Sequence, residues 1–345
     1  MTLNRYEGLP GGYYNRVKLP SPRGPLSEHV VAALSGEPDG RAIAFAAADP
    51  YGEDLTIALH TLYELHYGGF DGVDPAWEWD PELLRLRARV EHVFLHALRS
   101  DVDGGDDLDA ALDALLIERV PGNGVSHHLR DSGTWDHMRE FFAHRSVYHH
   151  KEADPHAWVI PRLRGEAKAA LVAVEFDEYG GGRADRMHSR LFADLLDGAG
   201  MRSEYLHYLD EVPAPAIAIV NMMSMFGLHR SLRGALVGHF AAAEITTGPS
   251  AHRMTQALAR LDADPRCVEF YTEHIEADAV HEQIMRRDVI GSLLEQEPSL
   301  RTDVVFGVQA TELLEERLSA HLLSSWEAGE SSLRTRLRWL VSQNG

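Results

Sequence analysis

The sequence predicts an all-α fold, and three observations support this prediction. Apolar residues recur at the 3.6-residue spacing of helices, as in IALHTLYELHY (57–67) and PELLRLRARVEHVFLHALRS (81–100). Strand patterns are nearly absent, because no long segment alternates with a period of two. The Asn123-Gly124 pair does not join two β-branched runs and is interpreted as a loop before His127 and His128.

The elements follow in order from this pattern. Residues 1–26, with many Gly, Pro and Arg, are expected to form an irregular arm that ends at PSPRGP. Ser27 is expected to cap a helical segment that runs toward Ala48, and Pro81 suits the first turn of the helix over 81–100. DGGDD at 103–107 is predicted to be a loop. Further helices are predicted at about 107–118, 134–152, 161–179, 184–199, 202–210, 214–245, 250–261, 265–295 and 301–326.

These elements suggest one helical domain with additions at both ends, and we find no internal repeat or low-complexity segment. The expected division is an arm (1–26), N-terminal helices that pack on the core (27–129), a central helical domain (130–300) and C-terminal helices (301–345). Bundles of this type build metal sites from side chains on facing helices.

The composition bounds the function. The 345 residues are 44% hydrophobic and 25% charged, as in ordinary globular proteins. Thirty-three Lys and Arg against 53 Asp and Glu give a net charge of −20, which disfavours nucleic acid or an anionic membrane as a partner and favours a small-molecule substrate. The single cysteine, Cys267, excludes an intramolecular disulfide and fits a reducing cytoplasm. The first 20 residues have no apolar core of a signal peptide, and the apolar run at 214–228 is too short to span a membrane.

One short segment, EFYTEHIEADAVHEQI (269–284), carries three potential metal ligands. His274, Asp278 and His281 are spaced i, i+4, i+7, which places them within one narrow stripe of a helix. Apolar residues around them, among them Phe270 and Ile284, indicate that this stripe faces inward. Because buried charge without compensation costs several kcal/mol, a metal ion would explain all three groups. The alternative is a solvated helix on which His and Asp merely recur.

A second segment, KAALVAVEFDEYGGGRADRMHSRLF (168–192), brings acids out of an apolar run. Glu175, Asp177 and Glu178 follow AALVAV directly, and the azimuth of Glu178 is inward. His188 comes ten residues after Glu178, about 15 Å away if the helix were continuous. The three glycines at 180–182 could fold the chain back so that the two side chains converge. The alternative is a glycine cap followed by a helix with His188 on its surface.

A third segment, FFAHRSVYHHKEADPHAWVIPRL (141–163), offers Glu152 at the end of a predicted helix. Periodicity does not choose between this acid and the histidines around it. The competing candidates are His144, His149, His150 and His156.

Together these motifs resemble a known family, the haem-oxygenase-like diiron oxidases and oxygenases, also called iron-containing redox enzymes. The resemblance covers roughly residues 130–290 through YHHKEADPHAW, EFDEYGGG with RMHSRLF, FGLHRSLRGALVGHFAAAE (226–244) and EHIEADAVHE. It implies a haem-oxygenase-like helical bundle in which the central domain is the diiron catalytic domain. It also implies two Fe ions, cycling between Fe(II) and Fe(III), with dioxygen as co-substrate. The ligands carried over are Glu152, Glu178, His188, His274, Asp278 and His281.

The resemblance extends to five further polar residues, which would lie around the metal or line the substrate pocket: Asn221, Arg230, Arg233, His239 and Glu244. For His239 and Glu244, polar contacts between packed helices are an equal alternative. Arg230 and Arg233 could pair with a substrate carboxylate, and an acid-rich interior could receive an ammonium group.

The expected function is therefore a non-haem diiron oxygenase or oxidase that oxidises a small amine or amino acid, by N-oxygenation or oxidative C–C cleavage. The alternatives are a fatty-acid-oxidising member of the same fold and a non-catalytic metal- or partner-binding protein. An external reductant and a homodimer are compatible with either enzyme.

Overall fold

The computed structural model describes residues 17–36, 48–117 and 122–337, and it leaves out the side chains of residues 276–279. All regular structure in these ranges is helical, which confirms the predicted all-α class. The helices of the first half are α1 (Pro25–Leu34), α2 (Glu53–Glu64), α3 (Pro81–Asp101), α4 (Leu108–Leu115), α5 (Val125–Asp131), α6 (Trp135–His149), α7 (Asp154–Ala157) and α8 (Gly165–Glu178). The second half contains α9 (His188–Gly198), α10 (Ala214–Leu228), α11 (Arg233–Arg260), α12 (Pro265–Gln283), the π-helix η7 (Ile284–Gly291), α13 (Ser292–Gln296) and α14 (Arg301–Glu327).

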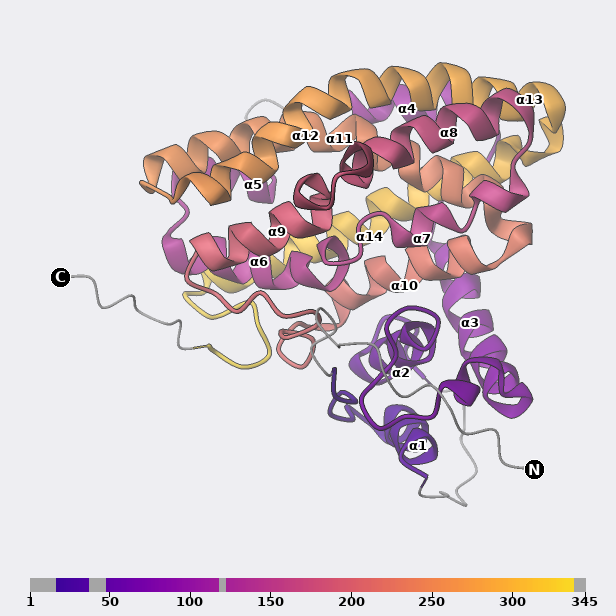
Figure 1. Cartoon of the computed structure of the whole chain (residues 1–345), viewed down its shortest axis with the longest axis horizontal. Helices are drawn as coiled ribbons and strands as arrows, with labels where there is room; N and C mark the ends of the chain where they lie inside the picture. Colours follow the sequence, from indigo (N-terminus) through magenta and orange to yellow (C-terminus); the bar gives the residue numbers. More distant parts are fainter. Residues whose placement is uncertain (1–16, 37–47, 118–121, 338–345) are drawn as a thin grey trace.

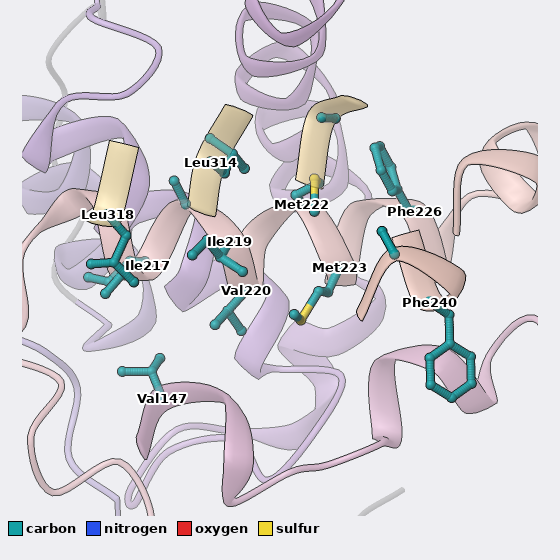
Figure 2. Close-up of a cluster of buried hydrophobic side chains, with 14 of the residues drawn as sticks. Val147, Ile217, Ile219, Val220, Met222, Met223, Phe226, Phe240, Leu314 and Leu318 are labelled. Atoms are coloured by element: carbon teal, nitrogen blue, oxygen red, sulfur yellow. The ribbon is translucent and has the colours of Figure 1, made fainter. Parts of the chain in front are cut away.

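The long helices α10, α11 and α14 form the centre of the bundle. The α10 helix is apolar on nearly all sides, and Figure 2 shows Ile219 and Met222 of this helix beside Leu314 of α14. Helices α11 and α14 approach each other closely, because a Cβ added at Gly238 would overlap the backbone oxygen of Val304. Small residues therefore set the separation of these two helices.

The N-terminal helices α1, α2 and α3 lie below the main bundle in Figure 1, and α2 packs on α10. Helix α1 begins at Pro25, inside the expected arm, so the predicted Ser27 cap is wrong. Ser27 instead lies in the first turn, where its hydroxyl donates to the carbonyl of Gly24. The carboxylate of Asp54, from α2, accepts from the backbone N–H groups of Leu26 and Ser27 and so caps α1 from outside.

Three of the predicted helices differ from the structure. The predicted helix 214–245 is two helices, because α10 ends at Leu228 and α11 begins at Arg233. Helix α11 then continues through Pro249, where a boundary was expected. The segment 202–210 forms turns. Asn123 and Gly124 lie in a loop before His127 and His128, as predicted, but the helix α5 that begins at Val125 was not predicted. The part of the 27–48 segment beyond residue 36 lies outside the described residues.

The division of the chain into an arm, N-terminal helices, a catalytic domain and C-terminal helices stays a prediction, and parts of its two terminal segments lie outside the described residues. Within the described ranges, no helix combines the length and apolar character that crossing a membrane requires.

Candidate metal centre

The chain reverses between α8 and α9, and this brings Glu178 to His188. Glycines 180, 181 and 182 all adopt positive φ, between 61° and 81°, which lets the backbone turn sharply where other residues would be strained. Oε2 of Glu178, the last residue of α8, lies 2.9 Å from Nδ1 of His188, the first residue of α9. The convergence predicted from the three glycines is confirmed.

Glu152, His188 and His274 form the first of two ligand groups. Their nearest ligand atoms lie within 4.8 Å of one another, and all three residues are buried. Nδ1 of His274 donates to the carbonyl of Phe270, which leaves Nε2 facing Oε1 of Glu152 at 3.8 Å. Nδ1 of His149 donates to the other carboxylate oxygen of Glu152 at 2.9 Å. Glu152 and His274 are therefore each oriented by a hydrogen bond to a neighbour.

Glu178, Glu244 and His281 form the second group, also within 4.8 Å. Nδ1 of His281 lies 3.2 Å from Oε2 of Glu244 and 3.8 Å from Oε1 of Glu178. On the other side of the ring, Nε2 donates to Oδ2 of Asp177 at 3.1 Å. Because Asp177 takes the Nε2 proton, Nδ1 is the atom available to an ion.

The two groups adjoin each other, and their chemistry fits metal ions. None of the six residues is more than 7% exposed. Nδ1 of His188 makes no hydrogen bond within the described residues, although it lies 2.9 Å from Glu178. Such close approach without a shared proton is expected when both atoms are directed at an ion. Three carboxylates and three imidazoles, without thiolates, suit iron, manganese or zinc.

The electrostatics of the groups point the same way. Burial would raise the pKa of Glu152, but the charge and hydrogen bond of His149, with those of His274, hold it well below its usual range. Burial would lower the pKa of His281, but Glu244, Asp177 and Glu178 raise it to about 9. Burial and the charge of Glu178 raise the pKa of Glu244, despite its hydrogen bond to His281. In the metal-free protein, the protonated imidazole of His281 thus replaces part of the charge that ions would supply.

The structure places the remaining predicted residues as follows. Asp278 lies in α12, but its side chain is outside the described residues. Asn221 is buried in α10 and donates to the carbonyl of Thr56. Nδ1 of His239 pairs with the hydroxyl of Thr311 in α14 at 2.8 Å, as the helix-packing alternative proposed.

Of the two predicted arginines, Arg233 begins α11 and Arg230 lies three residues before it, away from the ligand groups. Arg233 pairs with Glu297, and Arg230 is exposed. Eleven residues of helix separate Arg233 from Glu244, which corresponds to about 16 Å along the axis. The structure does not bring these arginines to the two groups.

Glu244 is the residue whose position the sequence interpretation missed, since it was assigned to the surroundings of the metal and not to the ligands. The signal was present. Glu244 directly follows the run GHFAAA, and Glu178 comes four residues after AALVAV. An acid next to a buried run is itself expected to be buried, and a buried acid needs a partner. Among the histidines that competed with Glu152, His149 is its hydrogen-bond partner, and His144 pairs instead with Ser332.

An all-helical protein with two adjoining His and Glu groups in its core has the architecture of a non-haem metalloenzyme. Residues 139–316, more than half of the chain, match the family of iron-containing redox enzymes, and the protein belongs to this family. It is therefore an oxidoreductase of the haem-oxygenase-like class. Residues of the chain are also similar to nitrosourea synthase from Streptomyces achromogenes subsp. streptozoticus, at 26% identity over 193 residues. This match covers 56% of the present chain but only 39% of the length of that enzyme.

Proposed function

We propose that this protein is a diiron oxygenase that uses dioxygen to oxidise a small organic amine or amino acid. The observation that carries the proposal is the contact between Glu178 and His188, which joins two buried three-ligand groups into one centre. In the first group Glu152, His188 and His274 would hold one iron. In the second, Glu178, Glu244 and His281 would hold the other, with Asp278 as a further ligand.

The irons would supply electrons to dioxygen and Lewis acidity. The chain itself supplies a dry and oriented site. Burial of all six side chains excludes water, which would compete with substrate and quench reactive species. Hydrogen bonds from His149 to Glu152 and from His281 to Asp177 fix the orientation of potential ligands from opposite sides of the centre.

The balance of the proposed reaction requires a reductant. For N-oxygenation, an amine, dioxygen, two electrons and two protons give a hydroxylamine and water. The electrons would come from an external two-electron donor. Oxidative C–C cleavage is the second outcome that this centre would support, since dioxygen activation is common to both, and the pocket decides between them.

The similar nitrosourea synthase is named for a product that contains an N–O bond, and this supports nitrogen as the atom oxidised. The distance of Arg233 from Glu244 argues against substrate binding through the arginine pair, because one small amino acid cannot span about 16 Å. Recognition of the amine end is the better expectation. A cytoplasmic location and a homodimer remain part of the proposal.

Iron loading and oxygen uptake test this function. We expect the anaerobically loaded protein to hold two irons per chain and to consume dioxygen faster with amines or amino acids than without substrate. His188→Ala and Glu244→Ala should each lower the iron content and abolish substrate-dependent uptake. His92→Ala, on the exposed face of α3, is the matched control and should leave both unchanged. A wild-type protein that holds no iron, or a Glu244→Ala variant with full activity, would contradict the proposal.

A further inference from the structure

Glu175 is a buried acid that belongs to neither ligand group. It lies on α8, one turn before Glu178, on the inward face that also contains Leu171 and Val174. Its side chain is only 2% exposed. Neither of its carboxylate oxygens has a hydrogen-bond partner within the described part of the chain. A buried carboxyl group without a donor is costly, so a partner from outside the protein is expected.

The charges around Glu175 offer it no partner. The charges that raise the pKa of Glu175 are those of Glu178, Glu244 and Asp154, and all three residues are acids. The buried cation of this region, Lys151, is already paired, because its Nζ lies 2.8 Å from Oε2 of Glu64. Acids therefore predominate around Glu175, and the nearby imidazole of His281 already pairs with Glu244 and Asp177.

Its position on α8, three residues before Glu178, places Glu175 beside the ligands. Burial and the charges of four acids, Glu152, Glu178, Glu175 and Glu244, all raise the pKa of Tyr148. The half-buried phenol of Tyr148 is therefore subject to the charges of Glu175 and of acids from both ligand groups. Since α8 positions Glu175 and Glu178 three residues apart, their Cβ atoms are about 5–6 Å apart.

Metal ions would compensate the ligand carboxylates, but Glu175 belongs to neither of the two groups that could hold an ion. Without ions, burial and the neighbouring acids raise the pKa of Glu175 to about 9, so a proton serves as its partner. When metal cations occupy the adjacent ligand groups, loss of the proton from Glu175 becomes less costly. The ionised carboxylate of Glu175 is buried and then needs a positively charged partner.

We propose that Glu175 is the cation-binding subsite of the substrate pocket, which pairs with the primary ammonium or guanidinium group of the substrate. This inference rests on the proposed function and narrows its substrate class to small organic cations. The short separation from Glu178 means that the charged nitrogen, or a carbon bonded to it, lies next to the metal centre. A fatty acid fits poorly, because its carboxylate would meet only like charges here.

Ligand binding without dioxygen tests the subsite separately from turnover. The Fe(II)-loaded protein is titrated under nitrogen with matched pairs that differ in charge: lysine and norleucine, arginine and citrulline, hexylamine and hexanol, with hexanoate as the anionic probe. We expect the cation of at least one pair to bind at least tenfold more tightly than its neutral partner. Glu175→Gln should abolish this preference without changing the affinity for the neutral ligand. Glu166→Gln, exposed in the first turn of α8, is the control and should keep the preference.

The outcomes separate the two proposals. If the wild type shows no preference in any pair, or if Glu175→Gln retains it, the subsite is refuted. If Glu175→Gln does not fold, Glu175→Asp is measured in its place. A preference for the cation in both the wild type and Glu175→Asp then supports the subsite, and loss of this preference in Glu175→Asp counts against it. Cation binding that depends on Glu175 without any oxygen uptake would overturn the oxygenase function and leave the subsite standing.

Discussion

Asp177 offers a direct test of how the second ligand group is oriented. Its Oδ2 accepts the Nε2 proton of His281 at 3.1 Å, which leaves Nδ1 facing Glu244 and Glu178. Replacing Asp177 with Ala removes this acceptor, so the imidazole can adopt the other tautomer or rotate. The loss of such a supporting partner typically weakens metal binding by about 10–100-fold. Because the Asp177 side chain is 58% exposed, water replaces part of the interaction, and we expect the lower end of this range, about tenfold or ~1.4 kcal/mol.

The assay is an anaerobic titration with Mn(II) in which free Mn(II) is followed by electron paramagnetic resonance. Asp177→Ala should weaken the binding event at Glu178, Glu244 and His281 most, and it should affect the other event, at Glu152, His188 and His274, only to the smaller extent that Glu178 couples the two groups. Asp177→Asn keeps an acceptor oxygen and should lie between Ala and the wild type. Asp185→Asn is the control, because Asp185 is an exposed acid that pairs with a neighbouring arginine. Two binding events at wild-type affinity in Asp177→Ala would refute the reasoning.

Three further predictions concern stability. The pKa of His281 is about 9 in the metal-free fold against about 6.5 in an unfolded chain, so its stabilisation is complete below about pH 6.5 and is lost as pH rises through 9. Urea unfolding of the metal-free protein should show a decline on the order of 3 kcal/mol over this window, absent in His281→Gln. Gly238→Ala should cost about 1–3 kcal/mol in thermal unfolding because its Cβ meets the α14 backbone, whereas Gly291→Ala, with nothing nearer than 4.0 Å, should cost much less. Lys151→Met leaves Glu64 buried without its cation and should cost about 3–5 kcal/mol by denaturant titration; an unchanged midpoint would contradict the ion pair.

The helices that the sequence predicted well are those with a clear apolar stripe. Helix α3 begins at Pro81 and is capped by Asp80, as its first-turn proline indicated. The break between α10 and α11 was not predictable in this way, because α10 is apolar on almost all sides and carries no periodic signal that could end. Pro249 was taken as a boundary, but the buried face of α11 continues to Leu258, and packing outweighs the lost hydrogen bond.

The site was predictable where a local feature forced the chain to turn. The glycines at 180–182 explained how Glu178 and His188 meet, and this is a property of backbone freedom that the sequence displays directly. The approach of α11 to α12 has no such local signature, because it depends on the packing of long helices against each other. Glu244 was consequently placed around the centre and not within it.

The position of Glu178 between the two groups has a thermodynamic consequence. The carboxylate of Glu178 contacts ligands of both groups, so an ion that binds in one group and reorients this carboxylate also changes the affinity of the other group for its ion. Binding of the two ions should therefore be cooperative. The half-loaded protein would then be a minor species at equilibrium. Variants of Glu178 should impair both binding events together, and the effects of paired substitutions across the two groups should be strongly non-additive.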